Sequence, residues 1–106
     1  MLRITTDEND QAIEIKLEGR IAGPWVAEFS RTWIETAPRL ARRKLVLDLR
    51  NVTYVDALGK QALIHIHAQS GAELTVSTPW AQHLAEEIRA NKTSQENEDQ
   101  NDSDIA

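Results

Sequence analysis

Residues 45–59 read Leu-Val-Leu-Asp-Leu-Arg-Asn-Val-Thr-Tyr-Val-Asp-Ala-Leu-Gly. The first five are nearly all apolar, which is typical of a strand that is buried on both faces and central in a sheet. Asp48 interrupts this run, and we expect neighbouring backbone N–H groups at the strand end to hold its carboxylate. The polar residues that follow predict a loop over residues 50–55, which leads to a new element at Asp56.

The element after the loop is predicted to be a helix with Asp56 as its N-cap. The Asp56 carboxylate can accept hydrogen bonds from the first free backbone N–H groups, and it lies at the positive end of the helix dipole. The pattern continues to about Gln69, and Gly71 is placed to end the helix in a left-handed conformation. The apolar residues at helical spacing are Leu58, Ala62, Leu63 and Ile66.

A hairpin is predicted upstream of the buried strand. Leu2 and Ile4 alternate with polar residues, and so do the apolar residues over 13–17, which is the period of half-buried strands. The polar residues 7–10 predict the turn between the two strands, and Gly19 is expected to end the second one.

An amphipathic helix connects this hairpin to the buried strand. Pro24 suits the first turn of a helix, where its missing N–H costs nothing. Pro38 is expected to end the helix near residue 37. Apolar side chains recur at spacings of three and four: Val26, Phe29, Trp33, Ala37 and Leu40.

Downstream, a short alternating strand over residues 73–76 precedes a third helix. Thr78 and Pro79 are placed to begin that helix, and its apolar face comprises Trp80, Ala81, Leu84, Ala85 and Ile88. The predicted order is therefore β-β-α-β-α-β-α. This order favours an α/β fold in one domain over residues 1–90, with a mixed, mainly parallel four-stranded sheet and helices packed against it.

Size and composition exclude several classes of protein. A chain of 106 residues has room for one core. The absence of cysteine excludes a disulfide scaffold, a thiol nucleophile and a cysteine-ligated zinc site. No apolar run is long enough to cross a membrane, and the first residues lack the pattern of a signal peptide. We therefore expect a cytoplasmic protein without direct membrane insertion.

The net charge of −5 is concentrated at the C-terminal end. Residues 91–106 contain one lysine and five acidic residues, and Ile105 is their only large apolar side chain. Such a segment buries too little surface to offset its ordering entropy, so an acidic disordered tail is expected there. Residues 1–90 are nearly neutral, whereas nucleic-acid binding requires a basic excess, so no nucleic-acid partner is expected.

The order and spacing of residues 45–59 resemble the centre of STAS domains, the family of anti-sigma-factor antagonists. That family shows an apolar strand ending in Asp-Leu, a short loop, an apolar-aromatic pair and then Asp-Ser-Ser-Gly at the start of a helix. Two further segments are similar to the family, Ile15-Lys16-Leu17-Glu18-Gly19-Arg20 and Gly71-Ala72-Glu73-Leu74. The resemblance covers about residues 2–89, and it implies a STAS-like fold.

The family's phosphorylation switch is not expected to operate in this chain. In the family, a partner kinase that is also an anti-sigma factor phosphorylates the first serine of the motif, and only the dephosphorylated domain binds it. Asp56 and Gly59 match the motif, but Ala57 stands at the phosphoserine position and Leu58 at the next serine. Ala57 has no hydroxyl group. Lys60 also replaces a residue that is usually apolar in the family.

The resemblance places a partner-binding surface around the start of the second helix. Its expected residues are Asp56, Ala57, Leu58, Gly59 and Lys60, together with Trp25, which the family's fold places beside them. Trp25 and Trp80 are candidates for partner contact, because exposed aromatic side chains are enriched at protein interfaces, although tryptophans at helix starts also fold back onto the core. Thr53 is a conceivable modification site, but a structural hydrogen bond of its hydroxyl is the expected role.

Little in the sequence favours catalysis, and we expect no enzyme, metal or cofactor. His65 and His67 are two apart on a predicted helix and therefore point in different directions, while His83 lies on another helix. The basic run of Arg39, Arg42, Arg43 and Lys44 is expected to be a solvated loop, with an acidic partner or anionic ligand as the alternative.

Three functions remain open at this point. The leading hypothesis is a regulatory module that docks on a kinase or anti-sigma-type ATPase, or on a sensor complex, without a serine phosphoswitch. The second is a cytoplasmic STAS-like subunit of an ATP-driven membrane transporter. The third is a sensor of a small anion or nucleotide, bound at the loops after the parallel strands.

Overall fold

The computed structural model describes residues 1–91, so the predicted acidic tail lies outside the described residues. Its elements are β1 (Leu2–Glu8), β2 (Ala12–Ile21), α1 (Trp25–Leu40), β3 (Lys44–Val55), α2 (Ala57–Ser70) and β4 (Glu73–Thr75), and residues 79–91 are helical. The sheet has four strands in the order β1-β2-β3-β4. β1 is antiparallel to β2, and β2, β3 and β4 are parallel. The predicted α/β fold and mixed sheet are confirmed.

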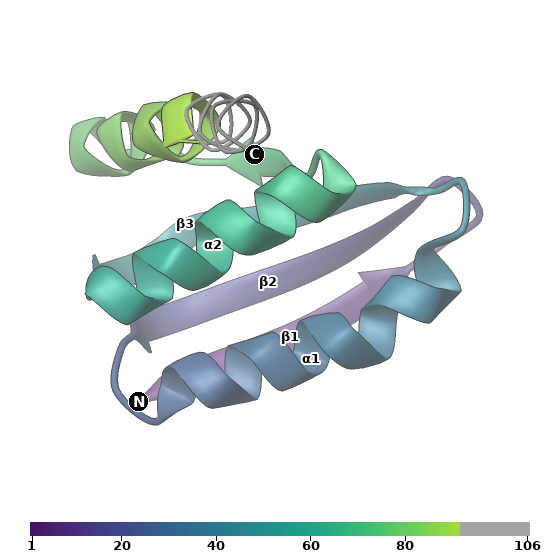
Figure 1. Cartoon of the computed structure of the whole chain (residues 1–106), viewed down its shortest axis with the longest axis horizontal. Helices are drawn as coiled ribbons and strands as arrows, with labels where there is room; N and C mark the ends of the chain where they lie inside the picture. The colour runs from purple at the N-terminus through teal and green to yellow at the C-terminus, as the bar shows by residue number, and fades with distance from the viewer. Residues whose placement is uncertain (92–106) are drawn as a thin grey trace, which may run out of the picture.

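Both crossover helices cover the same face of the sheet, as Figure 1 shows for α1 and α2. Alternate residues of the central strands point towards them and are buried, among them Ile13, Ile15 and Leu17 of β2 and Leu45 and Leu47 of β3. Phe29 and Trp33 of α1 and Leu63 and Ile66 of α2 complete the same core, as predicted for Trp33. The removal of these apolar side chains from water is the main contribution to stability.

The opposite face of the sheet is polar. Glu14 and Lys16 of β2 point away from the helices and lie beside Val46 and Asp48 of β3. β3 is central, as predicted, but Val46 is only half-buried, so residues 1–91 do not fully cover one face of the strand. Asp48 is 2% exposed, and it accepts hydrogen bonds from the backbone N–H and the guanidinium of Arg50 at 2.9–3.1 Å. The predicted hydrogen bond from a neighbouring backbone N–H to Asp48 is present, and the Arg50 guanidinium adds an ion pair to it.

β2 and β3 extend further than the sequence indicated. The prediction of a loop over residues 50–55 is wrong, because β3 continues to Val55. Gly19 likewise does not end β2, which continues to Ile21 and pairs with Val55 through two shifts of register. Arg50, Asn51 and Thr53 have exposed side chains but belong to β3. Asn51 pairs with Glu18 of β2, whereas Arg50 and Thr53 lie at the two shifts of register.

Three other boundaries differ from the prediction. β1 reaches Glu8, and the turn forms instead around Asn9, whose side chain accepts the N–H groups of Gln11 and Ala12. α1 passes through Pro38 to Leu40, because a proline so near the helix end removes only one hydrogen bond. β4 ends at Thr75, one residue early.

The predicted caps at both ends of α2 and at the start of the helix over residues 79–91 are confirmed. Asp56 is the N-cap of α2, and Gly71 follows that helix with a φ of 65°, in the left-handed region. The hydroxyl of Thr78 accepts the N–H of Ala81 at 3.3 Å, which caps the helix over residues 79–91. No helix within residues 1–91 is long and apolar enough to cross a membrane.

Candidate functional site: the helix-start face

Three helices of residues 1–91 begin at one end of the sheet. Each of the parallel strands β2, β3 and β4 is followed by a helix, so the starts of α1, α2 and the helix over residues 79–91 lie near the carboxyl ends of these strands (Figure 1). Open α/β sheets generally carry their binding sites at this end. Asp56, Ala57, Leu58 and Gly59 lie here, and so does Trp25.

Asp56 joins two of these helix starts. Its Oδ1 accepts the N–H of Gly59 at 2.7 Å, and its Oδ2 accepts the N–H of Gly23, in the loop before α1, at 2.9 Å. The backbone N–H of Asp56 donates to the carbonyl of Ile21 at the end of β2. The hydrogen bonds from Gly23 and then Gly59 hold the pKa of the Asp56 carboxyl below its ordinary value. Asp56 is therefore a structural clamp at the centre of the face.

Gly59 lets α2 approach the sheet closely. A Cβ at this position would overlap the carbonyl oxygen of Ile21 and would lie 3.1 Å from Cγ1 of Val55. The Asp and Gly that match the family motif thus build the helix start, whereas Ala57 and Leu58 between them are exposed. Among the four motif positions, the exposed side chains that a partner could contact are therefore those of Ala57 and Leu58, the two residues that depart from the motif.

Because Asp56 holds two helix starts together through its carboxylate, we expect the variant Asp56→Asn to be less stable than wild type, by an amount that depends on pH. Because the folded-state pKa is lowered, the ionised carboxylate stabilises the fold above the unfolded-state pKa of about 3.9. That contribution is lost as the pH falls through the folded-state pKa. We expect Asp56→Asn to lower the Tm at pH 7, and the difference from wild type to shrink towards pH 3.

Thermal unfolding followed by circular dichroism measures this difference. Glu86→Gln removes a carboxylate at an exposed position of the helix over residues 79–91 and serves as the control. A Tm difference for Asp56→Asn that stays constant from pH 7 to pH 3 would contradict the role of the ionised carboxylate.

Large apolar side chains are exposed around this clamp. We define the helix-start face by the exposed residues Met1, Trp25, Tyr54, Ala57, Leu58 and Trp80. Leu58 is 59% exposed, Tyr54 46%, Trp80 42% and Trp25 37%. Met1 belongs here because β1 is antiparallel to β2 and the Met1 carbonyl accepts the N–H of Arg20. Five of the six exposed large apolar residues within residues 1–91 therefore gather at one end of the sheet.

Sequence reasoning missed Tyr54 and Met1 as members of this face. Tyr54 lies in the segment expected to be a loop, and the guanidinium of Arg20 stacks over its ring at 4.7 Å. The position of Met1 follows only from the pairing of β1 with β2. The hydroxyl of nearby Thr53 donates to the carbonyl of Gly19 at 3.2 Å, which confirms the expected structural hydrogen bond.

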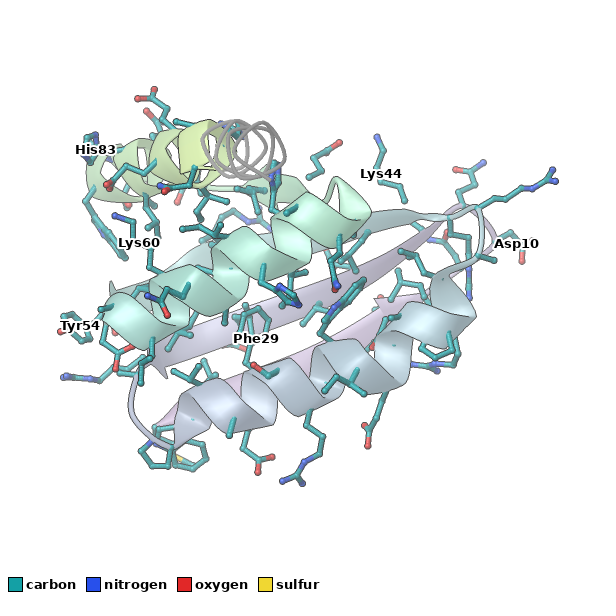
Figure 2. All side chains as sticks on the ribbon, viewed as in Figure 1. Asp10, Phe29, Lys44, Tyr54, Lys60 and His83 are labelled. Carbon is teal, nitrogen blue, oxygen red and sulfur yellow. The ribbon has the colours of Figure 1, made fainter. Side chains whose placement is uncertain are left out.

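Lys60 forms an ion pair within the chain. Its Nζ lies 2.6 Å from Oε2 of Glu87, and this ion pair joins α2 to the helix over residues 79–91. The hydrogen bond from Lys60 lowers the pKa of Glu87. His83 lies 3.6 Å from the other oxygen of the same carboxylate. Figure 2 shows Lys60, Tyr54 and His83 at the same end of the molecule.

The basic run lies away from this face, at the start of β3. Arg39 and Arg43 form ion pairs with Glu8 at 2.7 and 3.1 Å, and Lys44 pairs with Glu73 at 3.0 Å. Arg39, Arg43 and Lys44 therefore bind acidic residues of the same chain. Because they lie away from the helix-start face, they add no charge to it.

Neither the histidines nor the acids of residues 1–91 form a group that could hold a metal ion. His65 instead lines a groove of about 390 Å³ between α1 and α2, together with Ser30, Trp33, Ile34, Ala62, Ile66 and Gln69. Nε1 of Trp33 donates to the Gln69 side chain at 3.0 Å in this groove. The groove lies along the helices and is separate from the loops where the ligand-sensor hypothesis places a site.

Comparisons with known proteins agree with the fold. A family model described as "Mlab, STAS domain" matches residues 4–92. The structure of an anti-sigma-factor antagonist STAS domain from Rhodobacter sphaeroides superposes with a TM-score of 0.52 at 20% identity, over 71% of this chain and 84% of that one. The crystal structure of Mglu superposes over 71% of this chain with a TM-score of 0.53 at 19% identity, but the match spans only 19% of the Mglu chain. A search of curated proteins finds no match.

Proposed function

The chain belongs to the STAS domain family, and from that premise we propose that it regulates a partner protein that docks on the helix-start face. The partner we propose is a kinase or anti-sigma-type ATPase, or a sensor complex. The likeness to an anti-sigma-factor antagonist is a likeness of fold, and it is consistent with a regulatory protein-binding module.

The observation that carries this proposal is the concentration of exposed apolar side chains around the matched motif. Tryptophan and tyrosine supply large contact areas at little entropic cost and are enriched among residues that dominate binding energies. Trp25, Tyr54 and Leu58 come from three different elements. The strand ends and the hydrogen bonds of Asp56 hold the main chain around these three residues in place. A partner would therefore meet a largely preorganised surface.

We further propose that binding is not controlled by phosphorylation at the family's serine position. Ala57 is exposed at the first position of α2, where the family carries the modified serine. A phosphate there would add about −1.5 to −2 charges to the face. Alanine cannot receive it, so the domain would remain permanently competent to bind.

The variant Ala57→Glu tests the proposed face. A glutamate in the first turn of α2 is favourable to the helix dipole, so the domain should stay folded with an unchanged Tm. The same charge is desolvated when a partner covers it, so we expect binding to weaken by about 30-fold or more. The measurement is quantitative capture from lysate of the native host, with mass spectrometry of the captured proteins.

Ala90→Glu is the control. It adds the same charge at an exposed position near the C-terminal end of the helix over residues 79–91, away from the helix-start face. A protein captured by wild type and Ala90→Glu, and lost with Ala57→Glu, would support the face. Equal capture by all three forms would contradict it. A kinase-type or anti-sigma protein would identify the partner class proposed here, whereas a transporter ATPase would replace it with the second hypothesis of the sequence analysis.

A further inference from the structure

Among residues 1–91, no strand pairs with the outer edge of β1. Within these residues β1 pairs with β2 alone and lies at the end of the strand order. Seven residues without proline, from Leu2 to Glu8, therefore present one side of their main chain outward. A free edge of this kind is a template for pairing with another strand.

The pairing with β2 decides which main-chain groups are available. The carbonyl of Met1 accepts the N–H of Arg20, so the main-chain groups of residue 1 point to β2. In an antiparallel ladder the direction alternates, and those of residues 3, 5 and 7 point the same way. The N–H and C=O groups of Leu2, Ile4, Thr6 and Glu8 consequently face outward.

Opposite charges flank the midpoint of this edge. Arg3 and Asp7 are both exposed on the polar face of the sheet, and each is two residues from Thr5 at the centre of β1. In the register with β2 they lie opposite Glu18 and Glu14. Within residues 1–91, neither side chain forms a hydrogen bond or an ion pair, so both are available to a second chain.

We propose that a second copy of this chain pairs antiparallel with β1 about a two-fold axis at Thr5. In this register Ile4 lies opposite Thr6 of the second copy and Leu2 opposite Glu8, and these are the outward-facing residues that exchange main-chain hydrogen bonds. Arg3 then lies opposite Asp7 of the second copy, twice by symmetry. These are non-hydrogen-bonded pairs, whose Cα atoms are only about 4.5 Å apart, so the charged side chains meet closely.

The charges and the strand length select the same register. Pairing about Thr5 overlaps all seven residues of β1. A shift of the axis to Ile4 or to Thr6 shortens the overlap and places Arg3 or Asp7 opposite Thr5. Opposite charges directly across two strands are stabilising, whereas like charges are destabilising.

The resulting dimer has a consequence for the position of the two helix-start faces. The two sheets would join into one continuous sheet in which the strands of one copy run opposite to those of the other. The helix-start faces would therefore point to opposite ends of the dimer. This inference does not depend on the proposed function, but it would let one dimer hold two partner molecules apart.

Sedimentation velocity of the full chain, over a concentration series at low salt, tests the inference. We expect a monomer–dimer equilibrium that weakens about tenfold or more in Arg3→Asp and in Asp7→Arg, because each variant places like charges opposite each other. An equimolar mixture of the two variants should associate again, since each Asp then meets an Arg. The double variant should also dimerise.

Matched charge reversals far from β1 provide the control. Arg89→Asp and Glu86→Arg are exposed on the helix over residues 79–91 and should leave association unchanged. A wild-type chain that stays monomeric throughout the series would overturn the inference. Association that is insensitive to the two reversals, or a mixture that stays monomeric, would equally overturn it.

Discussion

The variant Gly59→Ala is expected to destabilise the domain by about 3 kcal/mol, which is large for the addition of one methyl group. The reason is the main chain of Ile21, whose carbonyl oxygen would overlap the new Cβ. A backbone atom at the end of β2 cannot move aside as a flexible side chain can. The start of α2 would have to shift instead, and this would strain the Asp56 clamp.

Thermal unfolding measures the effect, and we expect the Tm to fall by roughly 10–20 °C. Helix propensity alone gives the opposite sign, because alanine is favoured over glycine by about 1 kcal/mol in a helix. Gly71→Ala is the matched control. It meets open space but requires a positive φ, so a smaller loss of about 1 kcal/mol is expected. An unchanged or raised Tm for Gly59→Ala would contradict the close approach.

The variant Leu58→Asp is expected to weaken partner binding by at least about 30-fold, or about 2 kcal/mol. Leu58 is the large apolar side chain that α2 contributes to the helix-start face, and it is 59% exposed. The aspartate replaces an apolar contact with a charge that the interface would have to desolvate. It should leave the fold intact, because an acidic residue in the first turn of a helix interacts favourably with the dipole.

Ile34→Asp separates loss of the face from loss of an exposed apolar residue in general. Ile34 is 67% exposed, but it lies midway along α1 beside the groove. Isothermal titration calorimetry with the captured partner should give wild-type affinity for Ile34→Asp. Loss of affinity in Ile34→Asp but not in Leu58→Asp would move the docking surface from the helix-start face to the groove.

The fold class was predictable because its strongest signals are local. Alternation over residues 13–17 and the apolar run at 45–49 mark the two central strands, and the carboxylate of Asp56 marks the start of α2. The second half of β3 was missed because its exposed polar residues look like a loop. Their strand conformation depends on pairing with the end of β2, which no local pattern reveals.

The candidate site was predictable only where a motif marks it. Asp56 and Gly59 stand out by resemblance, but their structural roles depend on Gly23 and Ile21, which are distant in sequence. The ion pair of Lys60 could not be predicted, because Glu87 lies on another helix. Met1 and Tyr54 could have been found by asking which residues the predicted hairpin and crossovers bring to the carboxyl ends of the parallel strands.

Site-specific photocrosslinking in the native host tests the docking face most directly. A p-benzoylphenylalanine at position 58 should yield a discrete crosslinked protein, and the same group at position 34 should not. This result would place the partner on the helix-start face even before the partner is identified. A discrete crosslink from position 34, with none from position 58, would contradict the account.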